Sequence, residues 1–204
     1  MMAIFNGRSM GDKLTSSALF SDGETSVGEF WAWAYSDLMG NTVRPLIAEF
    51  LVSKLLNAHH GQRIQWDGAD VAYKGLKIEV KSSAYVQSWH QDRLSKITFD
   101  IRPRTLTWDA SANLSHPITR PYGRHADLYV FCLLDEKDKE AADPRKLGQW
   151  KFFVLPTSQL NAAFRSQKTL SLSSLQKVTQ ALAYCQLKRE IDAYSCRDGV
   201  ASEI

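Results

Sequence analysis

Alternation of apolar and polar residues is clearest over residues 70–81, whose sequence is DVAYKGLKIEVK. The second half of this segment alternates without a break: Leu76, Ile78 and Val80 against Lys77, Glu79 and Lys81. Because successive side chains of a strand point to opposite faces, the apolar residues share one face and the charged residues share the other. The Lys74-Gly75 pair between the two halves is typical of a tight turn. The pattern therefore predicts a β-hairpin.

The turn decides which residues of this hairpin face each other. A two-residue turn at Lys74-Gly75 places Tyr73 opposite Leu76 and Asp70 directly opposite Glu79. Directly opposed Cβ atoms lie roughly 4.5–5.5 Å apart, and like charges in that position destabilise a hairpin. A bound divalent cation is the simplest reason for such a pair. Two alternatives stay open: a bulge at the turn that shifts the register, and an edge hairpin whose outer face is only solvated.

A second informative segment covers residues 42–57, TVRPLIAEFLVSKLLN. Thr42 fits a helix N-cap and Pro45 falls in the first turn, where a missing N–H is tolerated. Apolar residues cover most of the helix circumference, which predicts a largely buried helix. Glu49 lies in its middle, and a lone ionised carboxylate in such surroundings needs a partner or a metal ion. The alternative places Glu49 on a narrow polar strip with Ser53 and Asn57.

The remaining segments alternate between helical and strand patterns. Helices are predicted over residues 26–39, 158–164 and 173–187, and strands over 97–101, 126–134 and 150–155. A short loop and strand over residues 61–66 lead into the hairpin. The run ADLYVFCLL at 126–134 is continuously apolar, as expected for a strand buried on both faces. We predict a single α/β domain over residues 1–204, in which helices flank a central mixed β-sheet.

A helix carrying Glu49, a strand opened by Asp70 and a following strand carrying Glu79-Val80-Lys81 resemble the PD-(D/E)xK nuclease superfamily. This superfamily includes many restriction endonucleases and DNA-repair nucleases. The resemblance covers residues 42–90. Ala69 stands where the family has proline, which leaves Asp67 as a rival to Asp70. We prefer Asp70, because an offset of three residues puts Asp67 on the opposite strand face.

The resemblance implies a restriction endonuclease-like core and a metal-dependent endonuclease that hydrolyses DNA, in restriction, defence or repair. It assigns metal binding to four groups: the carboxylates of Asp70, Glu79 and Glu49 and the main-chain carbonyl of Val80. Hard oxygen ligands of this kind suit Mg²⁺, and Mn²⁺ is expected to substitute. Lys81 is assigned to activation of the attacking water. The alternative function is a non-catalytic nucleic-acid-binding or scaffold protein that keeps the nuclease fold.

Candidate DNA contacts follow the Glu-x-Lys strand. Gln87 is singled out because related nucleases often place a polar residue near the phosphate just past the lysine, and Ser83 lies in the same polar stretch. The alternative is that these residues only end the strand and cap the next element. Residues 90–125 hold six arginines and lysines against three aspartates. Such a stretch suits phosphate contacts, and its candidates are Arg93, Lys96, Arg102 and Arg104.

Composition sets the remaining expectations. With 204 residues, of which 44% are hydrophobic and 23% charged, the chain is long enough for a sizeable core, and its net charge of +3 is mild. The three cysteines form no Cys-x-x-Cys pair, which argues against a zinc site or a disulfide framework. The start MMAIFNGRSM does not fit a signal peptide, and no apolar run reaches the ~20 residues needed to span a bilayer. We expect a cytoplasmic protein that binds DNA and, if it cuts both strands, forms a homodimer.

Overall fold

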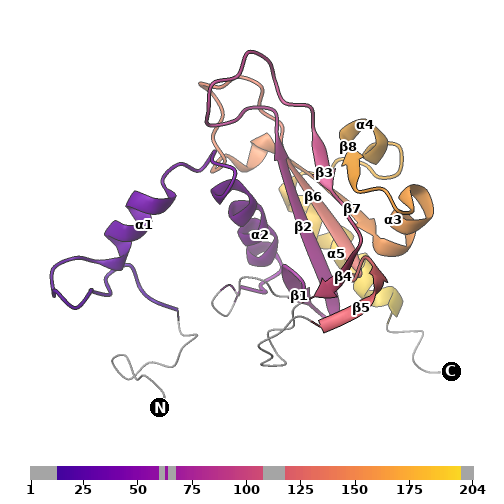
Figure 1. Cartoon of the computed structure of the whole chain (residues 1–204), viewed down its shortest axis with the longest axis horizontal. Coiled ribbons are helices and arrows are strands. Elements are labelled where there is room, and N and C mark those ends of the chain that lie inside the picture. Colours follow the sequence, from indigo (N-terminus) through magenta and orange to yellow (C-terminus); the bar gives the residue numbers. More distant parts are fainter. Residues whose placement is uncertain (1–12, 60–62, 64–67, 108–117, 199–204) are drawn as a thin grey trace.

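The centre of the molecule is a four-stranded sheet in the order β1 (Val71–Tyr73), β2 (Leu76–Ala84), β6 (Leu128–Leu134) and β7 (Trp150–Pro156). The structure is a computed structural model, and it describes residues 13–59, 63, 68–107 and 118–198. Strands β2 and β6 are parallel, whereas β1–β2 and β6–β7 are antiparallel. The predicted mixed sheet flanked by helices is confirmed (Figure 1).

Strand β6 is buried along its whole length, as its continuous apolar sequence predicted. Its residues alternate between the two cores of the protein. Leu128, Val130 and Cys132 belong to one core, and Tyr129, Phe131 and Leu133 belong to the other. A strand that is covered on both faces cannot carry polar side chains without partners, which explains why β6 lacks the alternation seen in β2.

The first core lies between the sheet and helices α2 (Val43–Leu55) and α5 (Tyr184–Asp198). Helix α2 contributes Ala48 and Val52, both with no exposed surface, and packs them against β2. The Tyr184 hydroxyl of α5 donates to the Leu51 carbonyl at 3.0 Å, which ties the two helices together. The predicted helix is therefore confirmed, but it is buried on one face and not around most of its circumference, since Phe50 is 54% exposed. Thr42 stands at its N-cap without a side-chain hydrogen bond.

The second core is covered by a separate small layer. Strands β3 (Thr98–Asp100) and β8 (Thr169–Ser171) pair antiparallel, and helices α3 (Thr157–Phe164) and α4 (Leu172–Leu175) stand beside them. Their buried apolar residues, among them Phe99, Leu160 and Leu170, pack against the face of β6 and β7. This layer lies over β6 and β7, so it leaves the corresponding face of β2 partly exposed.

The predicted helix over residues 173–187 is wrong. Helix α4 ends at Leu175 and α5 begins only at Tyr184. Between them, Leu182 and Phe152 exchange backbone hydrogen bonds of 2.8 and 3.0 Å, and the Thr179 hydroxyl donates to the Val154 carbonyl at 2.9 Å. The free edge of β7 thus captures this segment, because pairing satisfies backbone groups that the edge would otherwise expose.

Helix α1 (Val27–Tyr35) is shorter than predicted and packs differently. Its start is defined by a capping box in which Ser26 and Glu29 satisfy each other's backbone N–H groups. We expected the helix to pack on the core, but only Val27 is buried and the Trp33 side chain is 84% exposed. Aromatic residues on several sides leave no single apolar stripe to bury. In Figure 1 the helix stands apart from the sheet.

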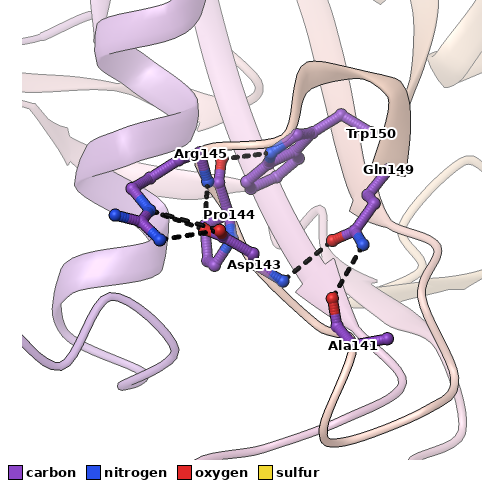
Figure 2. A network of polar contacts seen from close by, with 6 residues as sticks. All are labelled: Ala141, Asp143, Pro144, Arg145, Gln149 and Trp150. Atoms are coloured by element: carbon purple, nitrogen blue, oxygen red, sulfur yellow. Dashed lines mark hydrogen bonds and ion pairs between the residues drawn. The ribbon is translucent and has the colours of Figure 1, made fainter.

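Two further features were missed. Residues 102–124, predicted only as a basic stretch, contain the hairpin β4 (Arg104–Thr107) and β5 (Ile118–Gly123). The charged connection after β6, for which no element was predicted, is held by its own side chains around the short 3₁₀ turn Leu147–Gln149 (Figure 2). There Gln149 accepts from the Asp143 N–H at 2.8 Å, and the Trp150 indole donates to the Pro144 carbonyl at 2.8 Å. Among the described residues, no helix is both long and apolar enough to cross a membrane.

Candidate active site

The β1–β2 hairpin has the predicted register. Tyr73 pairs with Leu76 and Val71 pairs with Ile78, across a two-residue turn at Lys74-Gly75. Both turn residues have positive φ, 48° at Lys74 and 82° at Gly75, which is the turn geometry that matches the twist of a hairpin. The next residue before β1 is Asp70, so it stands level with Glu79, as the sequence predicted.

The backbone pairing between β1 and β2 ends at Val71. The side chain of Asp70, the residue before it, makes the next hydrogen bond to β2. Its Oδ2 atom accepts the Val80 N–H at 2.7 Å. Because the N–H and C=O groups of one strand residue point to the same side, the Val80 carbonyl also points toward this edge of β2. The structure thus gathers the Asp70 carboxylate and the Val80 backbone at one place.

The pKa of Asp70 shows how unfavourable this place is for a negative charge. Burial, and then the charges of Glu79 and Glu49, raise the pKa of Asp70 from 3.8 to about 7. The Val80 N–H and the charge of Lys81 act in the opposite direction but do not compensate. A raised pKa that is caused by burial together with neighbouring carboxylates is typical of functional sites. A cation beside Asp70 would remove the repulsion.

Glu79 and Lys81 lie on the partly exposed face of β2. The Lys81 ammonium donates to Glu79 Oε1, and the two side chains are 23% and 26% exposed, respectively. Ser83 follows on the same face and is half-buried. This pair was predicted to share a strand face, and the structure brings the two groups into direct contact.

Tyr129, which we did not predict, is the neighbour of Glu79 on β6. It is 5% exposed, and burial followed by the charge of Glu79 raises the pKa of its hydroxyl, while Arg124 and Arg104 act to lower it. Tyr129 therefore neighbours the acid of β2, and its pKa responds to the charges of Arg124 and Arg104. Nothing in the sequence marked it, because it stands inside a continuous apolar run.

Glu49 of α2 is held by Arg63, and its charge contributes to the raised pKa of Asp70. The Arg63 Nε atom lies 2.5 Å from Glu49 Oε2, and Arg63 Nη2 lies 3.0 Å from Glu49 Oε1. Among the described residues, no three His, Cys, Asp or Glu side chains come close enough together to hold a metal ion. Asp67, the rival of Asp70, and most of the strand predicted over residues 61–66 lie outside the described residues.

Gln87 is buried, with 6% exposed surface. Its Oε1 atom accepts from Arg44 Nη1 at 3.0 Å, and its Nε2 atom donates to the Ala84 carbonyl at 2.9 Å. Arg44 is itself 5% exposed and also donates to the Met39 carbonyl. In this structure Gln87 therefore links the end of β2 to the start of α2; a contact with DNA stays a prediction. Arg44 was not singled out, because a single arginine in a helix carries no sequence signal.

The four basic candidates, Arg93, Lys96, Arg102 and Arg104, are all exposed. Arg104 opens β4 and lies 3.7 Å from Asp100 through Nη2 and Oδ2. Its charge also acts to lower the pKa of Tyr129, the neighbour of Glu79 on β6. Two surface cavities lie elsewhere, one lined by residues between 20 and 33 and one between the loops 36–39 and 140–146.

One comparison with known proteins finds a match. The family described as bacteriophage T4 endonuclease IV matches residues 32–174, well over half of the chain. The matched span includes Glu49, Asp70, Glu79 and Lys81. Neither the curated proteins nor the solved structures contain a match.

Proposed function

The chain belongs to the bacteriophage T4 endonuclease IV family and is a DNA endonuclease, and we propose that it uses a divalent metal ion, held at the open end of the β1–β2 hairpin. The observation that carries the proposal is the position of Asp70: it precedes β1 level with Glu79 and accepts the Val80 N–H at 2.7 Å, and burial and the charges of Glu79 and Glu49 raise its pKa to about 7. We propose further that the fold and site are those of the PD-(D/E)xK superfamily. The order of the motif along the chain and the mixed sheet support this.

The donor set fits Mg²⁺. Asp70 and Glu79 offer carboxylate oxygens, the Val80 carbonyl points to the same edge, and Glu49 is near enough to act on the pKa of Asp70. Hard oxygen ligands suit Mg²⁺, which usually takes one or two protein carboxylates and keeps several waters, so Asp70 and Glu79 would be enough. When bound, the ion polarises a phosphoryl oxygen and acidifies a coordinated water. The residues of the chain supply the orientation.

Lys81 is the candidate for handling the attacking water. Its ammonium contacts Glu79 Oε1 from the same strand face, so it stands beside a proposed ligand without being one. From this position the amine can orient a water molecule or hold a proton at Nζ. A well-placed group of this kind contributes about 10²–10⁴-fold to a rate.

Phosphate contacts are proposed for the exposed basic residues that follow β2 in the chain. Arg104 is the leading candidate, because its charge reaches Tyr129 and Tyr129 neighbours Glu79. Arg93, Lys96 and Arg102 extend the basic surface, and Ser83 lies on the strand face of Lys81. Gln87 is proposed to position the end of β2 through Arg44. A homodimer is the assembly we propose if both strands are cut.

Thermal melting and plasmid cleavage test the proposal together. A ligand at 100 times its dissociation constant stabilises a protein by about 2.7 kcal/mol, so Mg²⁺ or Mn²⁺ should raise the melting temperature. Glu79→Ala should abolish both this rise and the cleavage. An unchanged melting temperature at saturating Mn²⁺ would argue strongly against the metal site. Metal binding without cleavage of plasmid or single-stranded DNA would instead favour a non-catalytic DNA-binding protein.

A further inference from the structure

Arg63 occupies both oxygens of the acid that α2 contributes to the site. Its Nε and Nη2 atoms lie 2.5 and 3.0 Å from Glu49 Oε2 and Oε1. The Glu49 side chain is only 13% exposed, whereas that of Arg63 is 46% exposed. The acid is thus fixed in the site, and the arginine approaches it from the solvent side.

The charge of a second acid, Asp70, also acts on Arg63. The hydrogen bonds and charge of Glu49, and then the charge of Asp70, raise the pKa of Arg63 above its already high value. Its guanidinium is therefore charged, and the acid that it contacts is Glu49. Glu79 has Lys81 as its partner, and Glu49 has Arg63.

We propose that Arg63 competes with the metal ion for Glu49 and binds a DNA phosphate when the metal ion takes this carboxylate. The inference rests on the proposed function. A forked arginine covers the two oxygens that a metal ion would approach, and two cations on one half-buried carboxylate repel each other. A guanidinium that leaves Glu49 needs another planar pair of oxygens, and a phosphate offers the same geometry.

This exchange couples metal binding to DNA binding. A phosphate that draws Arg63 away frees Glu49 for the metal, and a metal that takes Glu49 frees Arg63 for the phosphate. By linkage, each ligand must then raise the affinity of the other by the same factor. Couplings of this kind typically amount to about 5–150-fold. An ion pair with a purely structural role would give no such coupling.

Calorimetric titration of the full chain with Mn²⁺ alone tests the competition. Arg63→Ala should tighten Mn²⁺ binding by about fivefold or more, because the competing cation is gone. Arg145→Ala is the matched control, since Arg145 forms the same kind of forked pair with Asp143, at 2.9 Å through both Nε and Nη2, in the loop between β6 and β7 (Figure 2). Its Mn²⁺ affinity should equal that of the wild type.

A double-mutant cycle guards against a misfolded variant. In a Glu49→Gln background, Arg63→Ala should no longer change Mn²⁺ affinity, and Arg63→Lys in the wild-type background should have an intermediate effect. Equal or weaker Mn²⁺ binding by Arg63→Ala would overturn the competition. If the wild type itself binds no Mn²⁺, the proposed function fails, which is a different result.

Anisotropy of a labelled DNA duplex tests the phosphate contact. The measurement uses the Lys81→Ala background, chosen to slow turnover, with and without Mn²⁺. With Arg63 present, Mn²⁺ should tighten duplex binding, and Arg63→Ala should remove most of that gain. If Mn²⁺ increased duplex affinity equally with and without Arg63, this arginine would not exchange Glu49 for a DNA phosphate.

Discussion

The two ends of one hairpin hold two aspartates in opposite electrostatic states. At the turn, Asp192 of α5 accepts from the Tyr73 hydroxyl at 2.8 Å and from the Lys74 and Lys188 ammonium groups at 2.7 and 2.5 Å. These hydrogen bonds, those of the lysines above all, hold its pKa well below the usual range. At the open end, Asp70 has one backbone N–H as a hydrogen-bond donor and two acids as charged neighbours, and its pKa is raised to about 7.

The difference agrees with the roles that we propose, a structural one for Asp192 and a functional one for Asp70. Around Asp192, cations and a phenol satisfy the carboxylate, so its charge joins α5 to the hairpin. Around Asp70, burial and like charges act against ionisation, which is a cost that folding alone would not require. Local arrangements that oppose stability are expected where a ligand or a reaction needs them. The two acids can be told apart by substitution.

The largest effect is expected on the rate of cleavage. Lys81→Ala should lower the single-turnover rate by about 10²–10⁴-fold while metal and DNA binding stay largely intact, because Lys81 contacts Glu79 without acting as a ligand. Plasmid and single-stranded DNA with Mg²⁺ are the substrates. Lys188→Ala, which removes a partner of Asp192, should instead cost stability and leave the rate of the folded enzyme unchanged.

Lys77→Ala controls for loss of charge in this experiment. Lys77 lies on the same face of β2 as Glu79 and Lys81, on the side of Glu79 that is nearer the turn, and its side chain is exposed. Equal rates for wild type, Lys81→Ala and Lys77→Ala would remove Lys81 from the mechanism. Equal losses in both variants would mean that only the summed positive charge matters.

The second effect concerns the pH dependence of stability without metal. A carboxyl group with a raised pKa favours the protonated folded state, so folding loses stability as the pH rises from 3.8 to about 7. The full penalty is on the order of 4 kcal/mol. Asp70→Asn removes the ionisable group. The free energy of unfolding of this variant should therefore rise relative to that of the wild type between pH 3.8 and about 7. Urea unfolding in EDTA at pH 4.5 and pH 8 measures the difference, which saturating Mg²⁺ should reduce.

The outcome that would contradict this prediction is a difference between wild type and Asp70→Asn that stays constant with pH. Such a result would mean that Asp70 ionises freely in the folded protein. The comparison with Asp192 would then lose its basis, since folding would no longer disfavour the charge of Asp70.

The register of the hairpin was predictable because its determinants are local. Strand alternation fixes the faces of Glu79 and Lys81, and a two-residue turn at Lys74-Gly75 fixes Asp70 opposite Glu79. The same holds for β6, whose apolar run is long enough to specify burial on both faces. Residues whose roles depend on one strand pair or one strand face can therefore be read from sequence.

Residues whose roles depend on distant segments could not be predicted. Arg63 contacts Glu49 from a different segment, and Arg44 meets Gln87 across 43 positions. The helix predicted over residues 173–187 failed for the same reason, since the backbone groups of Phe152 on β7 outcompete a local helical pattern. Helix α1 forms, but its expected packing on the core was wrong. Its apolar composition does not tell whether the protein has another surface against which the helix can be buried.

A third effect tests how far the site extends beyond the hairpin. Glu49→Gln removes the charge but keeps the shape, so it should weaken Mn²⁺ binding by about 10–100-fold, as expected for a supporting ligand or its partner. Calorimetry measures this affinity, and melting curves check the fold. An unchanged affinity would leave Glu49 as a structural partner of Arg63 and restrict the metal site to Asp70, Glu79 and Val80.

The smallest effect is expected at Asp192. Exposed ion pairs contribute about 0.2–1 kcal/mol each, so Asp192→Asn should lower the free energy of unfolding by about 1 kcal/mol at neutral pH. Because the folded pKa is depressed, this stabilisation is present above the usual carboxyl value of 3.8 and is lost as the pH falls below it. High salt should weaken it further, since these side chains are partly exposed. Urea unfolding at pH 7 and pH 3 provides the measurement.

If Asp192→Asn instead altered Mg²⁺-dependent cleavage as strongly as a change at Asp70, the two ends of the hairpin would belong to one site.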